Sequence, residues 1–80
     1  MIELSGHAQE QMERKGISQR EVEECVKLGR LVSKQVIEGE MRYARTMPLK
    51  DKTVTVVYTL RGDRVRVITC YPIKRKRWKI

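Results

Sequence analysis

Apolar positions recur with two different periods along this chain of 80 residues. In the first third they return every three to four residues, which is typical of helices that bury one face. Ser5 can cap a helix over residues 6–15, and Gly16 follows where a left-handed helix end is needed. The segment Ser18–Glu21 has the capping-box pattern that begins a second helix, and we expect Gly29 to end it.

From residue 30 onward the period changes to two, as in strands that bury one face. Four strands are predicted, at residues 31–37, 41–47, 53–60 and 65–71. Helices followed by a run of hairpin-connected strands predict an α+β fold, with two N-terminal helices packed on a four-stranded antiparallel sheet. A chain of this length has room for one core, so we expect a single domain over residues 1–80 with a basic tail at 74–80.

Charge is distributed unevenly between the two parts of the chain. Residues 1–29 hold four Lys or Arg against six Asp or Glu, whereas residues 30–80 hold fourteen against four. The most basic segment is Lys74, Arg75, Lys76, Arg77, Trp78, Lys79 and Ile80. Cations neutralise phosphates, and an indole ring can stack on an unpaired base. We therefore expect this tail, with Arg64 and Arg66 on one strand face, to bind nucleic acid; a solvated tail that only aids solubility is the alternative.

Several protein classes are excluded by the residues that are missing. No apolar run approaches the roughly 20 residues that cross a bilayer, and the first residues do not resemble a signal peptide, so we expect no membrane contact. Cys25 and Cys70 each lie in an apolar pattern, which favours buried reduced thiols in a cytoplasmic protein over a disulfide. One histidine and no paired cysteines argue against a metal site, and no cofactor is expected. The small core leaves a homo-oligomer or a partner protein open.

The segment His7–Ser18 reads H-A-Q-E-Q-M-E-R-K-G-I-S. It resembles the H-A-x-x-R-M-x-x-R-G-I-S opening of a small family of domains of unknown function, although Gln11 and Lys15 replace the usual arginines. Shorter similarities follow at Gly39–Arg42, Val56–Tyr58 and Val67–Tyr71. That family is regarded as related to the RelE/ParE-type toxins of toxin–antitoxin systems, within the barnase–EndoU–colicin–RelE superfamily of metal-independent ribonucleases.

The resemblance implies a RelE-like fold and a toxin or toxin relative that cleaves RNA, free or on the ribosome, without a metal. It also implies a partner antitoxin protein. Two alternatives stay open at this point, because relatives of one fold often differ in chemistry. The first is a nucleic-acid-binding module without catalysis. The second is a protein-interaction domain paired with an antitoxin, since ParE-like relatives act on a protein rather than on RNA.

Metal-free cleavage of RNA needs a base, an acid and a cation at one phosphate. His7 is the natural proton carrier near neutral pH, and Tyr71 is the best second one. Thr69 shares a strand face with Tyr71 and can hold a phosphate oxygen, while Arg42 can grip phosphate with two parallel hydrogen bonds. Each has a structural alternative: a first-turn helix residue, an aromatic at the rim, a strand-filling threonine, and an arginine paired with a neighbouring glutamate.

Overall fold

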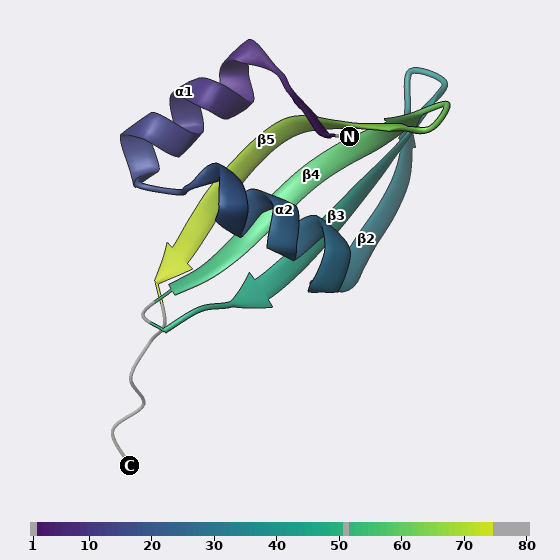
Figure 1. Cartoon of the computed structure of the whole chain (residues 1–80). Coiled ribbons are helices and arrows are strands. Elements are labelled where there is room, and N and C mark those ends of the chain that lie inside the picture. The colour runs from purple at the N-terminus through teal and green to yellow at the C-terminus, as the bar shows by residue number, and fades with distance from the viewer. Residues whose placement is uncertain (1, 51, 75–80) are drawn as a thin grey trace.

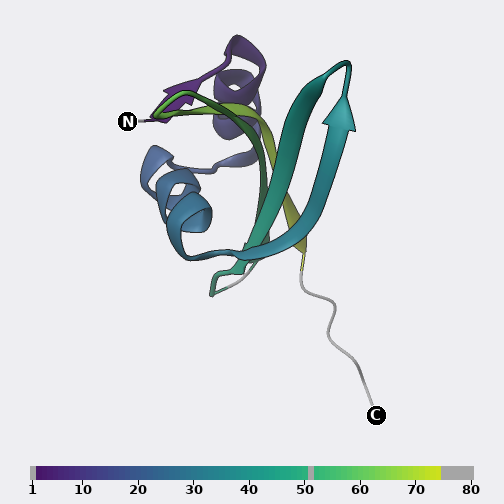
Figure 2. The ribbon, with the colours of Figure 1, turned by 90° about the vertical axis from the view of Figure 1, so that its right-hand side faces the viewer.

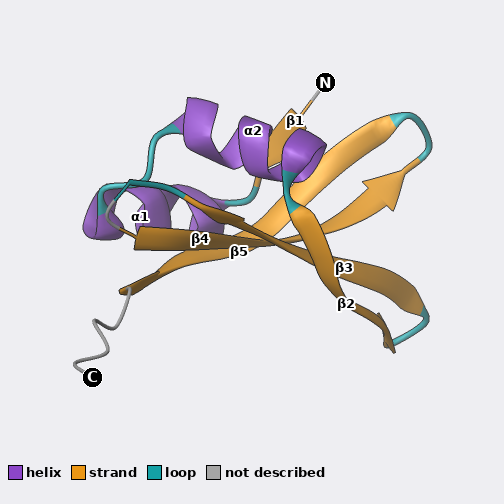
Figure 3. Cartoon of the chain, turned by 90° about the horizontal axis from the view of Figure 1, so that it is seen from below, coloured by secondary structure: helices purple, strands orange, loops and turns teal. Residues whose placement is uncertain are grey.

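The computed structural model describes residues 2–50 and 52–74, which form two helices and a five-stranded sheet (Figure 1). In chain order the elements are β1 (Ile2–Leu4), α1 (Gly6–Lys15), α2 (Gln19–Leu28), β2 (Arg30–Ile37), β3 (Glu40–Pro48), β4 (Lys52–Arg61) and β5 (Arg64–Lys74). Both helices lie on one side of the sheet, and no described helix covers the other side (Figure 2). The sheet is strongly twisted, as the view from below shows (Figure 3). Neither described helix is long and apolar enough to cross a membrane.

Both helices begin and end where local signals in the sequence predict. The Ser5 hydroxyl accepts a hydrogen bond from the Ala8 amide at 3.0 Å, and Gly16 ends α1 with φ of 67°. At the start of α2, the Ser18 hydroxyl accepts from the Glu21 amide at 3.1 Å, and the Glu21 carboxylate accepts from the Ser18 amide at 2.9 Å. The predicted cap of α1 and the capping box of α2 are therefore confirmed.

The sheet differs from the prediction in its number of strands and in its topology. Its strand order is β1-β5-β4-β3-β2, and β1 runs parallel to β5, with Ile2 opposite Val65. The predicted four-stranded antiparallel sheet of RelE-like type is therefore wrong, although the α+β class is correct. With three residues, β1 is too short to show an alternating pattern, and it is held by tertiary pairing. Directly after it, the Ser5 amide donates to the Val67 carbonyl at 3.0 Å, so the pairing with β5 continues to the helix cap.

The covered face of the sheet holds the core. Val56 of β4 lies opposite Cys70 of β5. Tyr58 lies opposite Val67, because β5 carries one extra residue, Ile68, at a bulge between these pairs. The nine buried hydrophobic residues are Ala8, Ile17, Val22, Cys25, Val54, Val56, Tyr58, Val67 and Cys70. They come from both helices, the loop between them and the two central strands, so the helices and the sheet depend on one shared core.

We call the other side of the sheet the open face. The register of the pairs, with side chains alternating along each strand, assigns its residues. They include Glu3 of β1, Ser33 and Gln35 of β2, Arg42, Ala44 and Thr46 of β3, Thr55, Val57, Thr59 and Arg61 of β4, and Arg64, Arg66, Thr69, Tyr71 and Ile73 of β5. Hydroxyl, amide and guanidinium groups predominate on this face, in contrast to the apolar covered face.

The two cysteines are free and buried, as the sequence predicts. The Cys25 sulfur lies 3.3 Å from the Arg45 carbonyl oxygen and 3.6 Å from that of Val54. Burial raises the pKa of Cys25 from its ordinary value of 9.0 to about 11, and it also raises the pKa of Cys70. Neither thiol is therefore a ready nucleophile at neutral pH.

The raised pKa of Cys25 predicts a loss of stability in alkaline solution. Above pH 9 the unfolded chain ionises this thiol, whereas the folded chain keeps the proton until about pH 11. The difference in pKa corresponds to a contribution of roughly 2 to 3 kcal/mol to the free energy of unfolding. This contribution is complete below pH 9 and is lost as the pH rises to about 11. Urea unfolding of the wild type and of Cys25→Ala at pH 8 and pH 10.5 measures it, because other titrating groups cancel in the difference. The stability advantage of the wild type should shrink at pH 10.5, and an unchanged advantage would contradict the prediction.

Candidate functional site

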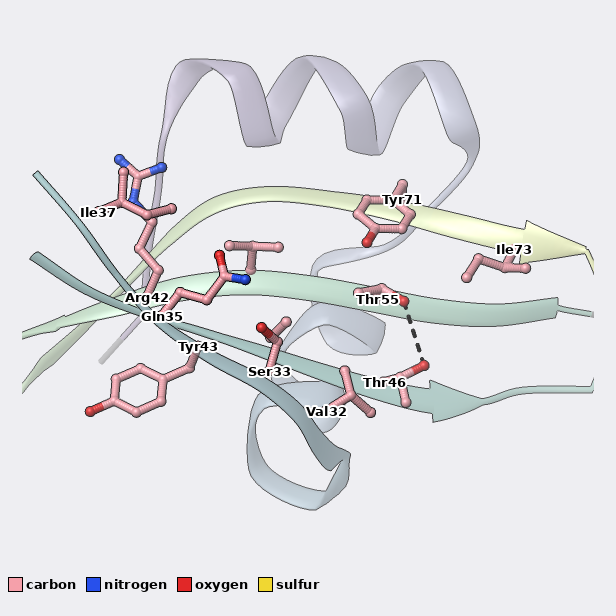
Figure 4. A pocket seen from close by; sticks show the side chains of 12 residues that line it. Val32, Ser33, Gln35, Ile37, Arg42, Tyr43, Thr46, Thr55, Tyr71 and Ile73 are labelled. Carbon is pink, nitrogen blue, oxygen red and sulfur yellow. Dashed lines mark hydrogen bonds between the residues drawn. The ribbon is translucent and has the colours of Figure 1, made fainter.

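A hollow of about 490 Å³ lies on the open face, between the paired strands β2 and β3 on one side and β5 on the other (Figure 4). Its lining residues are Val32, Ser33, Gln35, Ile37, Arg42, Tyr43, Ala44, Thr46, Thr55, Val57, Tyr71 and Ile73. The volume falls within the usual range for small-molecule sites. Because the strands bend around it, side chains from four of them meet in one concave surface.

Tyr71 and Ile73 lie at one end of the hollow, and Arg42 lies at the other (Figure 4). Tyr71 is 40% exposed and Ile73 is 51% exposed, so an aromatic ring and an aliphatic side chain meet solvent here. In the same row as Tyr71, the Thr55 hydroxyl donates to the Thr46 hydroxyl at 3.5 Å. The hollow thus combines an accessible aromatic face, neutral hydrogen-bonding groups and a single guanidinium.

Four arginines and two glutamates surround the Arg42 end of the open face. We call Arg42, Arg61, Arg64 and Arg66 the arginine cluster. The Glu40 carboxylate lies 3.3 Å from Arg61 Nη2 and 3.7 Å from Arg42 Nε. The Glu3 carboxylate lies 3.1 Å from Arg64 Nη1 and 3.8 Å from Arg66 Nη1. On the open face itself four cations thus meet two anions, while Glu38 and Asp63 lie in the two turns that adjoin this end of the sheet.

Arg42 and Arg45 have opposite roles although they lie close together on β3. Arg45 points to the covered side, where it donates to the Tyr58 hydroxyl at 2.7 Å and to the Gly29 carbonyl at 2.8 Å. Its guanidinium is thus part of the packing between α2 and the sheet. Arg42 lies on the open face, and its Nε is buried without a hydrogen-bond partner among the described residues. A buried donor of this kind is costly unless a ligand or water satisfies it.

The structure brings three of the four predicted catalytic residues to one face. Thr69 lies on the open face two residues before Tyr71, and Arg42 lies on the same face. Arg42 and Tyr71 are offset by four residues along the strands and by two strand spacings across them, which gives about 16 Å between their backbones. His7 is exposed in the first turn of α1, which packs on the covered side of β5, and it does not line the hollow.

The predicted nucleic-acid-binding residues fall into two groups. Arg64 and Arg66 share the open face, as the alternation along β5 predicts. Lys74 is the last residue of β5, and Arg75, Lys76, Arg77, Trp78 and Lys79 lie outside the described residues. The sequence missed Glu3 as the partner of Arg64 and Arg66, because its strand β1 was not predicted. Among the described residues, no group of three His, Cys, Asp or Glu could hold a metal ion.

Comparison with known proteins identifies the family of the chain. No curated protein and no solved structure matches the chain significantly. A family model described as a domain of unknown function, DUF4258, matches residues 4–72. This range includes both helices, the hollow except for Ile73, and the whole arginine cluster. The chain therefore belongs to the DUF4258 family.

Proposed function

We propose that the protein binds single-stranded nucleic acid, RNA above all, along the open face of its sheet. The observation that carries this proposal is the continuity of the face, on which a hollow with an exposed Tyr71 adjoins the arginine cluster. Phosphates are bound by the arginines, and unpaired bases enter the hollow. Base stacking on an aromatic ring beside a cationic track is the usual arrangement in proteins that bind single strands.

The polar groups in the hollow favour a single strand over a duplex. Ser33, Gln35, Thr46 and Thr55 offer neutral donors and acceptors that suit the edges of a base. A base presents its Watson–Crick edge and its ring face only when it is unpaired and unstacked. In the sequence, four more cations and Trp78 follow β5 directly, so the chain after Tyr71 adds further positive charge. A duplex would reach the cations but leave the hollow unused.

A second candidate function is metal-independent cleavage of the bound RNA by a relative of the RelE/ParE-type toxins. Tyr71, Thr69 and Arg42 on one face favour it, because they supply an acid, a hydrogen-bond donor and a cation. In this form of the proposal His7 takes no part in proton transfer, since it lies on the helix side of the sheet. The attacking 2′-hydroxyl gives its proton to solvent water, which acts as the base, and Tyr71 protonates the leaving 5′-oxygen. A toxin of this kind would also be paired with an antitoxin protein.

Fluorescence anisotropy with a labelled 12-nucleotide RNA, in EDTA and over a range of salt concentrations, tests the binding proposal. The single strand should bind more tightly than a duplex of the same sequence. A variant with glutamine at Arg75, Lys76, Arg77 and Lys79 removes four cations and should reduce the slope of log K against log salt by up to about 3. Absence of binding, or equal affinity for duplex and single strand, would refute the proposal.

A denaturing gel of the same samples separates the two candidate functions. Intact RNA after prolonged incubation supports binding without catalysis. Cleavage in EDTA that persists in His7→Ala but is lost in Tyr71→Phe supports the second candidate. Cleavage that is lost in His7→Ala, with the fold intact by circular dichroism, would show that the assignment of His7 to a structural position is wrong.

A further inference from the structure

Arg42 and Arg66 lie in the same row of the open face, on either side of Thr59. Thr59 of β4 is opposite Arg42 of β3 and opposite Arg66 of β5. Directly opposed residues in antiparallel strands have Cα atoms about 5 Å apart, so the two arginine backbones are about 10 Å apart. Thr59 is only 1% exposed although neither of the described helices covers this face, so neighbouring side chains cover it. Its hydroxyl is already used, since it donates to the Met41 carbonyl at 2.8 Å.

The two glutamates divide the arginine cluster into an outer and an inner pair. The outer pair is Arg61, 3.3 Å from Glu40, and Arg64, 3.1 Å from Glu3. Each of these two arginine side chains is 59% exposed. The inner pair is Arg42 and Arg66, at 3.7 and 3.8 Å from the same carboxylates and 32% and 40% exposed. These longer distances exceed a hydrogen bond. The inner arginines are therefore the more buried and the less satisfied of the four.

We propose that Arg42 and Arg66 form a clamp that holds one phosphodiester group above Thr59. This inference rests on the proposed binding of a single strand. Arginine side chains are long enough to converge on a group midway between backbones about 10 Å apart, and each guanidinium offers paired donors to phosphate oxygens. Glu40 and Glu3 stay with the outer arginines and act as weak counter-ions of the inner pair, which the phosphate replaces.

The clamp is tested by the affinity of the full chain for the 12-nucleotide RNA. Arg42→Gln and Arg66→Gln should each weaken binding about tenfold, and the double variant far less than a hundredfold, because both groups serve one phosphate. The double variant should also reduce the salt slope by about 0.7, the value for one phosphate, whereas two independent contacts would remove about 1.4. Arg61→Gln with Arg64→Gln should weaken binding clearly less than the inner double variant, because each outer guanidinium is already held by a carboxylate. The matched control is Arg14→Gln with Arg20→Gln, two exposed arginines of the helices, which should change affinity less than twofold.

Two further variants distinguish a clamp from general positive charge. Arg66→Lys keeps the charge but not the planar fork, and it should weaken binding nearly as much as Arg66→Gln. Glu40→Gln should tighten binding a few-fold, and this gain should vanish when it is combined with Arg42→Gln. Equal effects of the inner and outer pairs, or a salt slope that falls by about 1.4, would overturn the clamp while leaving RNA binding intact. No binding by the wild type would instead refute the proposed function itself.

Discussion

Gly29→Ala should lower the free energy of unfolding by about 3 kcal/mol, near the upper end of the range for overpacked buried sites. A Cβ atom at this position would overlap the Cys25 carbonyl oxygen and lie 3.0 Å from the Thr46 carbonyl oxygen. Both are backbone atoms, so relief requires the chain at the end of α2 to shift away from both the Cys25 carbonyl and β3. The Gly29 carbonyl also accepts the hydrogen bond from Arg45, so such a movement would disturb the guanidinium that joins α2 to Tyr58.

Urea denaturation of the wild type and two glycine variants measures this effect. Gly6→Ala is the matched control, because a Cβ at Gly6 meets nothing within 4 Å and alanine is the better helix former. It should unfold at the same urea concentration as the wild type or slightly above. A Gly29→Ala chain that is unfolded without urea agrees with the prediction, whereas one as stable as Gly6→Ala contradicts it.

Local signals in the sequence determine the helices and most strands, and this is why those predictions are correct. A cap such as Ser5 acts on residues within one turn, and a left-handed end such as Gly16 depends on its own φ. Gly29 shows where such reasoning stops. The sequence predicts it as a helix end, but its φ of −69° is open to other residues, and the glycine is needed because two backbone segments approach closely. That requirement is tertiary and leaves no local pattern.

The same distinction holds for the candidate site. Pairs on one strand, such as Thr69 with Tyr71 or Arg64 with Arg66, are predictable because a period of two puts them on one face. That Arg42 and Arg66 lie in one row could not be predicted in this way. It depends on β4 lying between β3 and β5, with Thr59 opposite both arginines. The position of His7 depends on which side of the sheet α1 covers. The helical pattern of the sequence is the same for either side, so it does not predict that position.

Tyr71→Ala should weaken binding of the single-stranded RNA by roughly 5- to 150-fold, because stacking of one base on an aromatic ring contributes about 1 to 3 kcal/mol. Tyr71 is the only aromatic ring that both lines the hollow and lies on the open face among the described residues. The substitution removes no charge, so the affinity should fall by the same factor at every salt concentration. An unchanged salt slope separates this effect from that of the arginine variants, which remove a phosphate contact.

Two neighbouring substitutions identify the part of the tyrosine that acts. Tyr71→Phe keeps the ring and should retain affinity within about threefold, within the range expected for one hydrogen bond. Ile73→Ala shortens the other exposed side chain at this end of the hollow and should weaken binding less than Tyr71→Ala does, because an aliphatic side chain offers no ring for stacking. If Tyr71→Phe binds as weakly as Tyr71→Ala, the hydroxyl rather than the stacking surface holds the RNA, and the hollow is then a hydrogen-bonding site instead of a base platform.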